Sequence, residues 1–371
     1  MTNVLRMAPL FWCLRFGAYL MLGSWILDLG LTSLFAADIL PKFLGSQGCA
    51  SAMCHGGADE KRNQFAIWSK KDFHTRAPAT LSMQRSARIA DTLKISDASS
   101  DTRCTVCHNP FQSVPAERKG PLVGKLEGVS CESCHNAAEN WLLTHTRTDL
   151  TYPQKVDAGL RDLKNLYVRA NTCVACHQNL APELRAAGHP ELTFELDGQC
   201  AAMPRHWRET NSIRGSQSWF VGQAVALRES AAQRSAAKAS DEVQRREAAL
   251  SWLLGIAAEP KAADDLARDT AGQNWTEAEA RSRLTKLAST HEQFANATSF
   301  EELPQRAERL VLGLERLLVA LKLNKNPVLS AKLDQLFKDV QSRPDFSPKL
   351  FAQHLKAFAD EIPPRAAAKP E

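Results

Sequence analysis

The chain has 371 residues, of which 44% are hydrophobic and 23% are charged, and this composition is typical of a globular protein with a sizeable core. Its length allows two domains. The formal net charge of +5 is modest and is not concentrated in a block of Lys and Arg, so we do not expect nucleic acid as a partner.

The N-terminal segment, residues 1–37, contains two arginines and ends in the apolar run FGAYLMLGSWILDLGLTSLFAA. This pattern is typical of an export signal or an N-terminal membrane anchor, and a buried helix is the alternative. Asp28 interrupts the run and Leu34 occupies the −3 position of the candidate cleavage site, so cleavage stays open. No later stretch has the 18 apolar residues of a membrane span. We therefore expect the rest of the chain in the periplasm, either free or attached to the inner membrane by an uncleaved signal.

Eight of the ten cysteines form four pairs in the next part of the chain, and a histidine directly follows the second cysteine of each pair. In a helical turn the spacing Cys-x-x-Cys-His puts two thiols and one imidazole on the same side. There the thiols can bond the vinyl groups of a haem, and the histidine can bind its iron as the proximal ligand. A zinc knuckle or a disulfide is the alternative, but neither needs a histidine after every second cysteine. Three pairs have this spacing and are called the second, third and fourth motifs: Cys104, Cys107 and His108; Cys131, Cys134 and His135; Cys173, Cys176 and His177.

The first pair, in the stretch GCASAMCHGG, has four residues between Cys49 and Cys54 and ends in His55. It keeps both thiols and the adjacent imidazole, and the small residues Ala, Ser and Ala in the linker can bulge without a steric penalty. We therefore interpret it as the first of four haem-attachment motifs, with a disulfide between Cys49 and Cys54 as the alternative. The sequence thus predicts four covalently attached c-type haems.

Four histidines of the same region remain for the opposite, distal face of each iron: His74, His145, His189 and His206. Four spare imidazoles for four irons predict two histidine ligands per haem. Asp72 can orient the ring of His74, and Trp141 can pack on a porphyrin near His145. Three methionines are alternative ligands, and an ordinary surface position is the alternative for each histidine. The spacing does not predict which histidine faces which iron.

These motifs resemble the tetrahaem cytochrome c-554-type family, the electron acceptors associated with hydroxylamine oxidation and their relatives. The resemblance covers roughly residues 45–225 and rests on the four motifs and on the stretches KKDFHTRA, CESCHNAAENWLLTH, GHPELTFELD and MPRHW. It implies a mainly α, haem-dense domain with little regular core, and covalent haem insertion outside the cytoplasm. The chain departs from the family in its longer first linker and in its extension after residue 211. One haem of the nitrifier proteins lacks a distal ligand, and the four spare histidines here put such an open site in doubt.

The C-terminal part of the chain has no further motif, and its pattern predicts a bundle of antiparallel helices that packs back on the haem domain through Trp219, Val225 and Leu227. An apolar stripe predicts one helix after a capping box formed by Thr298 or Ser299. Pro327 marks the end of this helix, a second helix is expected after it, and Ser347 and Pro348 open a last helix. We divide the chain into residues 1–37, a tetrahaem domain 38–210, a helical domain 211–362 and a disordered tail 363–371. The first stripe contains Leu303, Leu310, Leu314, Leu317 and Leu321, and the second contains Leu329, Leu333, Leu336 and Val340; the last helix carries Leu350, Phe351, Leu355 and Phe358.

Iron with two histidine ligands is coordinatively saturated and exchanges electrons with little rearrangement, at rather low potentials. The sequence therefore predicts an electron carrier between two redox proteins and not an enzyme, and no catalytic residues are assigned. The alternative is a haem oxidoreductase that acts on a small nitrogen or sulfur compound at one five-coordinate haem. Against it, no Cys-x-x-Cys-Lys motif occurs, and only Tyr152 and Tyr167 follow the N-terminal segment. A third reading is a haem-containing sensor or scaffold.

Overall fold

The computed structural model describes residues 40–209, 211–235, 240–297, 300–341 and 343–363. Within these residues the chain is mainly α-helical, as predicted, and its only extended pairing is an isolated parallel bridge between Phe43 and Lys119. No helix among them is both long and apolar enough to span a bilayer. The predicted export segment, the predicted capping residues Thr298 and Ser299, and the tail after Pro363 lie outside the described residues.

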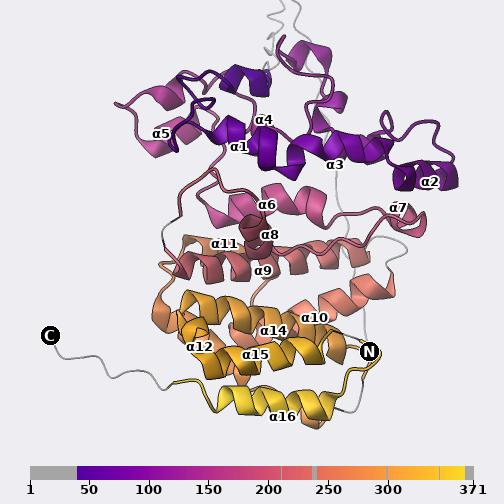
Figure 1. Ribbon diagram of the computed structural model, residues 1–371, viewed down its shortest axis with the longest axis vertical. Coiled ribbons are helices and arrows are strands. Elements are labelled where there is room, and N and C mark those ends of the chain that lie inside the picture. Colours follow the sequence, from indigo (N-terminus) through magenta and orange to yellow (C-terminus); the bar gives the residue numbers. More distant parts are fainter. Residues whose placement is uncertain (1–39, 210, 236–239, 298–299, 342, 364–371) are drawn as a thin grey trace, which may run out of the picture. The chain divides into compact units, whose positions relative to one another are not determined.

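The motif region, residues 40–209, consists of short helices joined by loops (Figure 1). Apart from α6 and α8, its apolar side chains form only two small clusters, one around Leu81 and one around Ile89. This part therefore has little apolar core, as predicted. Its helices are η1 (Ser46–Cys49), α1 (Gln64–Lys71), η2 (Phe73–Ser82), α2 (Gln84–Leu93), α3 (Thr102–His108), η3 (Pro110–Ser113), η4 (Ala116–Arg118), α4 (Cys131–His135), η5 (Thr144–Thr146), α5 (Tyr152–Asp157), α6 (Leu166–His177), α7 (Pro182–Ala186) and α8 (Leu196–Ala202).

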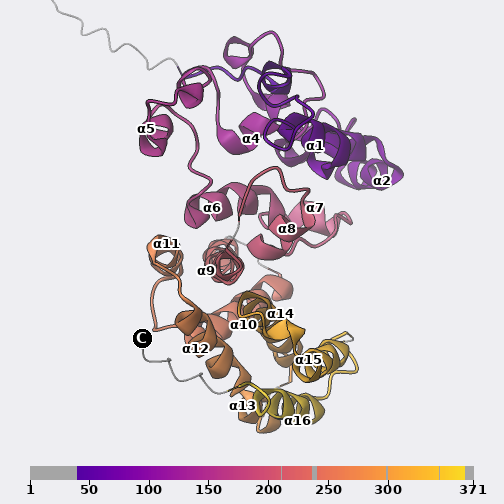
Figure 2. The same cartoon turned by 60° about the vertical axis from the view of Figure 1, so that its left-hand side comes forward.

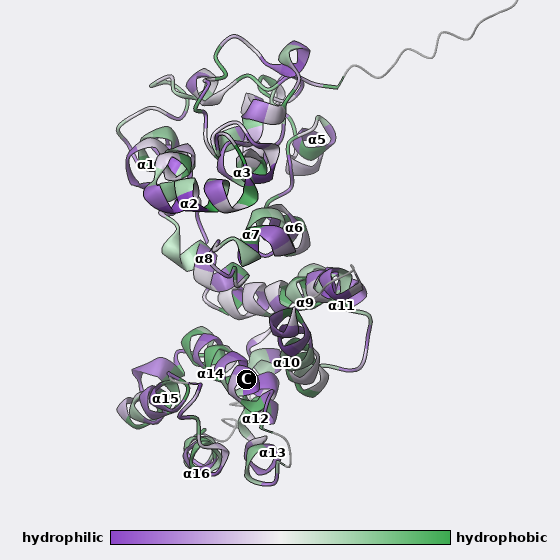
Figure 3. Ribbon diagram, turned by 90° about the vertical axis from the view of Figure 1, so that its right-hand side faces the viewer, coloured by the Kyte–Doolittle hydropathy of each residue, from purple (hydrophilic) through white to green (hydrophobic). Residues whose placement is uncertain are grey.

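The C-terminal region, residues 211–363, contains longer helices around one continuous apolar core. Hydrophobic and polar residues alternate around α10, α14 and α16, as is typical of amphipathic helices that bury one face (Figure 3). The helices are α9 (Ile213–Ser235), α10 (Asp241–Ala257), α11 (Ala263–Gly272), α12 (Glu277–Ala288), α13 (His291–Ala295), α14 (Leu303–Ala320), η6 (Leu323–Lys325), α15 (Pro327–Asp339) and α16 (Pro348–Ala359).

The apolar residues expected on the last helices are buried except for two: Val340, the C-cap of α15, is partly buried, and Leu350 is exposed. All five leucines of the first stripe lie in the core on α14 or at its end, and Leu329, Leu333 and Leu336 are buried on α15. The four apolar residues expected on the last helix all lie on α16, where Phe351, Leu355 and Phe358 are buried and Leu350 is 45% exposed. Leu350 lies one residue, and thus about 100°, away from the line through Phe351 and Leu355.

Helix α9 lies between the two regions and contacts α6 and α8 as well as α10, α11 and α14 (Figure 2). Because it is covered on several sides, its middle is buried around the whole circumference, including Trp219, Phe220 and Val225. The predicted packing of this helix back on the motif region is confirmed, since α9 contacts α6 and α8, whereas the ring of Trp219 lies against Gly313 of α14. The apolar core continues into α6 and α8, so it crosses residue 210, where the domain boundary stays a prediction.

Candidate haem-binding sites

The three regular motifs lie in helices that end at the proximal histidine. Helices α3, α4 and α6 end at His108, His135 and His177, respectively. Each helix also has a capped start, through Asp101, Ser130 and Asn165. Polar caps at these positions satisfy free backbone N–H groups and fix the first turn. Local sequence signals thus place each pair of thiols and its imidazole within one or two turns of the same helix.

The first motif forms a tight turn in place of a longer helix. The N–H of His55 donates to the carbonyl of Cys49 over 3.2 Å, and the N–H of Cys54 donates to the carbonyl of Ser51 over 2.9 Å. Gly56 follows directly, and a Cβ atom there would lie 1.9 Å from the carbonyl oxygen of Ala50. The longer linker therefore closes on itself and brings Cys49 back to His55, and the glycine after the motif is needed for this closure.

No disulfide forms among the nine cysteines that the structure describes, so Cys49 and Cys54 are both free thiols. In the same residues no group of three or more His, Cys, Asp or Glu side chains is arranged to hold a metal ion. The motif residues are therefore not gathered into the four-ligand cluster that the zinc alternative requires.

Three proximal histidines each face one of the spare histidines. The distance between ring centroids is 6.1 Å for His55 and His145, 6.0 Å for His74 and His177, and 6.4 Å for His108 and His189. Metal–imidazole bonds are about 2 Å long and each coordinating nitrogen lies about 1 Å from its ring centroid, so two imidazoles on opposite sides of one iron have centroids about 6 Å apart. The three spacings fit a single iron between the rings of each pair.

Five of these six rings are oriented by a hydrogen-bond acceptor at Nδ1. An imidazole that donates from one nitrogen to a carbonyl or carboxylate keeps the other nitrogen free for a metal, and such partners are usual around metal-bound histidines. The Nδ1 contacts are His55 to Gln64 Oε1 (3.0 Å), His74 to Asp72 Oδ1 (2.9 Å), His108 to Thr80 Oγ1 (2.8 Å), His145 to the Leu142 carbonyl (2.5 Å) and His189 to the Pro190 carbonyl (2.8 Å). In each case Nε2 is the nitrogen available to iron.

The sixth ring, that of His177, lies with Nδ1 3.2 Å from the side-chain amide nitrogen of Gln199. The other terminal atom of this amide, Oε1, is buried without a hydrogen-bond partner. The two amide atoms can exchange places by a 180° rotation, which would put the acceptor oxygen against Nδ1. In the present orientation the same amide nitrogen also donates to the Thr193 carbonyl over 3.3 Å, a contact that this rotation would break, so His177 differs from the other five rings.

Asp72 holds the ring of His74 with a buried carboxylate. Burial raises the pKa of this carboxyl group, but the hydrogen bonds from the ring and the backbone N–H of His74 outweigh it, so the pKa lies below its ordinary value. Asp72 is thus ionised at neutral pH and accepts the Nδ1 proton, in the orienting role that the sequence predicts for it.

The fourth combination, His135 and His206, does not form a facing pair of rings. Burial and the nearby charge of His206 lower the pKa of His135 to about 4, which indicates that the two side chains are neighbours. The Nδ1 atom of His206 is buried and makes no hydrogen bond of ordinary geometry. Burial lowers the pKa of His206, and the nearby carbonyl of Pro204 acts in the opposite direction. His206 thus has a weaker contact than the Nδ1 acceptors of five of the paired rings, and the structure does not bring it opposite His135.

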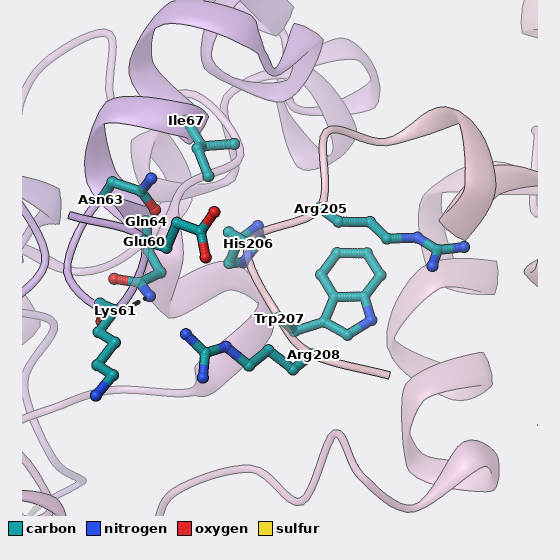
Figure 4. A pocket seen from close by; sticks show the side chains of 9 residues that line it. All are labelled: Glu60, Lys61, Asn63, Gln64, Ile67, Arg205, His206, Trp207 and Arg208. Atoms are coloured by element: carbon teal, nitrogen blue, oxygen red, sulfur yellow. Dashed lines mark hydrogen bonds between the residues drawn. The ribbon is translucent and has the colours of Figure 1, made fainter. Parts of the chain in front are cut away.

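A cavity of about 600 Å³ opens beside His206 (Figure 4). One side comes from the chain around α1, with Lys61 and Gln64, and the other from the segment that contains Arg205 and Arg208. Three cationic side chains and one carboxylate, that of Glu60, thus line a space of net positive charge next to the one candidate distal ligand that has no facing partner. Such a lining suits an anionic group, either the carboxylates of a haem or a small anion.

The cysteines of different motifs meet in the fold. A hydrogen bond between the thiols of Cys49 and Cys131 lowers the pKa of the first and raises that of the second, and the same holds for Cys107 and Cys176. On covalent attachment of haem these thiol sulfurs would become the sulfurs of thioether bonds. The first motif is therefore adjacent to the third, and the second is adjacent to the fourth.

A further contact links the third motif to the fourth through buried sulfur atoms. Burial raises the pKa of Cys173 to about 12, with smaller contributions from Cys200 and Cys134. Cys200, the cysteine outside the motifs, is buried beside both, and Cys134 is affected by it in turn. The four motifs thus follow one another in space in the order first, third, fourth and second.

Several apolar side chains of the motif region are exposed next to the motifs. Met53, Phe73, Val106 and Leu143 are 78, 78, 57 and 79% exposed, and each lies within two residues of a motif cysteine or a candidate ligand. Exposed apolar groups of this size are costly unless a ligand or partner covers them. A porphyrin is a flat apolar surface anchored at the same residues, so these side chains, with the ring spacings and the Nδ1 anchors, fit bound haem.

Some residues of the site could not be predicted from the sequence. Gln64, Thr80 and Gln199 contact proximal histidines that are 9, 28 and 22 residues away in the chain. Polar residues of these types are common, and only tertiary contacts bring them to a ring. Trp141 is buried and meets His145 edge to face at 5.2 Å, whereas contact with a porphyrin stays a prediction.

The segment that contains the first three motifs matches a known protein family. Residues 49–136 match the family model described as cytochrome c554 and c-prime. This part of the chain is of the cytochrome c554 type. The match implies covalently bound c-type haem and redox partners for the cytochrome. Searches among curated proteins and among solved structures found no match.

Proposed function

We propose that this cytochrome carries electrons between two redox proteins through four covalently attached c-type haems. The observation that carries the proposal is the set of three imidazole pairs, each with ring centroids about 6 Å apart. Haem iron between two histidines supplies one-electron exchange with little change in ligation. The residues of this chain hold the rings in place, since Nδ1 anchors fix their orientation before an electron arrives.

We assign His145 as the distal ligand of the first haem, His189 of the second and His74 of the fourth. His206 is assigned to the third haem, because it is the remaining spare histidine and the nearest one to His135. The thiol contacts between motifs support a relay in the order first, third, fourth and second. Neighbouring motifs in this order share buried contacts, so each porphyrin edge would meet the next within the protein interior.

We place the cytochrome outside the cytoplasm, in the periplasm, because its N-terminal segment is typical of export and because c-type attachment takes place there. The same segment, if it is retained, would attach the protein to the inner membrane. The expected partners are an electron donor and an electron acceptor, and nucleic acid is not expected.

A second candidate function is a haem oxidoreductase that acts on a small nitrogen or sulfur compound at the third haem. The observation that favours it is that His206 has no facing histidine ring and lies beside the cavity, whose charged lining residues are Glu60, Lys61, Arg205 and Arg208. If His206 does not bind the iron, one position is open next to a cationic space.

Electron paramagnetic resonance of the purified, oxidised holoprotein separates these functions. Four low-spin signals support the electron carrier, and one high-spin signal that is lost on adding a small anion supports the oxidoreductase. The ring planes of His55 and His145 are 18° apart, while those of His74 and His177 are 81° apart. Near-perpendicular ligand planes make the low-spin signal more anisotropic, so the first and fourth haems should be distinguishable. Fewer than four haems by mass would contradict both functions.

A further inference from the structure

The His189 loop, residues 187–195, connects α7 to α8 and carries the ring that faces His108. Gly188 has φ +101°, a left-handed conformation that ends α7 and turns the chain. The N–H of Gly188 donates to the carbonyl of Arg185, and that of His189 donates to the carbonyl of Leu184, both over 3.0 Å. The start of the loop is thus fixed on α7.

The middle of the loop is held by an ion pair with the C-terminal region. Glu191, two residues after His189, pairs with Arg246 of α10 and, over 2.6 Å, with Arg185 of α7. The side chain of Arg246 is only 3% exposed, so its charge depends on this carboxylate. Arg185 also donates to the hydroxyl of Ser240 over 2.7 Å, and Ser240 is the N-cap of α10. Glu191 therefore ties the loop to the start of α10.

The end of the loop is embedded in the C-terminal core. Phe194 and Leu196 are fully buried in it, and Leu196 packs so close to α9 that a Cβ atom at Gly222 would lie 2.8 Å from its Cβ. Directly after the loop, Asp197 pairs with Arg316 of α14 over 3.0 Å. The loop is thus held in place by three helices of the C-terminal region, α9, α10 and α14.

We propose that Arg246, through Glu191, is a positioning residue that keeps His189 against the iron of the second haem. The inference rests on the proposed ligation by His189 and gives the C-terminal region a role in it. The ring itself has only a local anchor, at the adjacent Pro190 carbonyl, so its distance from His108 depends on the loop. Without Arg246, Glu191 keeps only its pair with Arg185 of α7, so the middle of the loop loses its direct ion pair with α10 and the ring can leave the metal in part of the molecules.

The test uses three variants of the holoprotein: Arg246→Gln, Arg246→Lys and the control Arg234→Gln. The control also removes an arginine ion pair with α10, because Arg234 of α9 pairs with Glu247 of α10. We expect Arg246→Gln to convert one low-spin signal to high spin in a measurable fraction of molecules, and to add carbon monoxide binding after reduction. Arg246→Lys keeps the charge and should restore most of the low-spin signal. The control should match the wild type.

His189→Ala separates this inference from the ligation on which it rests. If His189→Ala leaves every spectrum unchanged, the proposed ligation fails. If His189→Ala exposes one haem but Arg246→Gln stays fully low-spin, the positioning role alone is overturned. Should Arg246→Gln not fold by circular dichroism, Glu191→Gln decides, because it leaves the buried arginine in place and removes the clamp. A low-spin spectrum and no added carbon monoxide binding in Glu191→Gln would then contradict the inference.

Discussion

The two regions of this cytochrome are held together by different means. In the motif region, outside α6 and α8, apolar side chains form two clusters of three buried residues each, and large groups such as Phe73 and Leu143 point to the surface. In the C-terminal region one continuous core covers helices from α9 to α16 and reaches into α6 and α8. The first region therefore has little apolar core of its own and would gain one from bound haem, whereas the second buries its own side chains.

The largest expected effect comes from removing the haems. Replacing the eight motif cysteines by serine prevents covalent attachment, and the motif region then lacks the surface that covers its exposed apolar groups. We expect hydrogen exchange to show loss of protection in residues 40–157 and continued protection in α9 to α16. Cys200→Ser, which leaves the four motifs intact, is the control. Full protection of α3 and α4 in the variant without motif cysteines would refute this contrast between the regions.

A core substitution in the C-terminal region should lower the stability of the protein without changing its bound haem. Leu314 is fully buried on α14, and Leu314→Ala should lower the free energy of unfolding by about 2–5 kcal/mol, because it leaves a cavity. Chemical denaturation followed by circular dichroism measures the loss, while the haem absorption of the folded protein should not change. Val319→Ala, at a 44% exposed position of the same helix, should cost less than about 0.5 kcal/mol. Equal effects of the two variants would contradict this assignment of the core.

The connection between the regions should depend on pH through Asp197. Burial raises the pKa of Asp197 to about 6, from an ordinary value of 3.8, although Arg316 acts in the opposite direction. Between pH 4 and 6 the folded chain therefore binds the extra proton, and the free energy of unfolding falls as the pH rises through this range.

Asp197→Asn removes this contribution. The free energy of unfolding of the variant minus that of the wild type should therefore be about 2–3 kcal/mol larger at pH 7.5 than at pH 4, as measured by chemical denaturation at both pH values. Asp334→Asn, at an exposed position of α15, is the charge-matched control. A constant difference between wild type and Asp197→Asn at the two pH values would rule out the raised pKa.

The smallest effect is expected at the carboxylate that orients His74. The ionised Asp72 accepts the Nδ1 proton and makes the imidazole a stronger electron donor, which favours oxidised iron. Asp72→Asn should raise the reduction potential of the fourth haem and leave the other three unchanged, as followed by a potentiometric titration of the most anisotropic low-spin signal. Asp91→Asn, an exposed change on α2, should move none of them. A shift shared by all four haems would point to a general charge effect.

Local patterns in the sequence predict a large part of this molecule, because they depend on neighbours in the chain. The spacing of Cys131, Cys134 and His135 requires one helical turn, and the stripe through Leu310 and Leu314 requires one buried face; both elements are present. Leu350 lies on the expected last helix but is exposed, because apolar character alone does not place a residue on the buried face of α16. The ligand assignments themselves stay predictions.

Contacts between distant parts of the chain could not be predicted in the same way. His55 and His145 are 90 residues apart, and their meeting depends on how the loops between them pack. The same holds for Gln199 beside His177 and for Glu191 beside Arg246. No spacing rule links such residues, since each side chain has many alternative partners of the same type.

The meeting of sulfur atoms from different motifs has a consequence for the order of biogenesis. Cys49 lies against Cys131 and Cys107 against Cys176, so a folded chain with free thiols would be exposed to wrong crosslinks in an oxidising compartment. A region that stays open until its prosthetic groups are attached avoids this outcome, because its cysteines meet only after they have become thioethers. If haem is attached in such a compartment as proposed, the small intrinsic core of the motif region would keep these cysteines apart until their thioether bonds have formed.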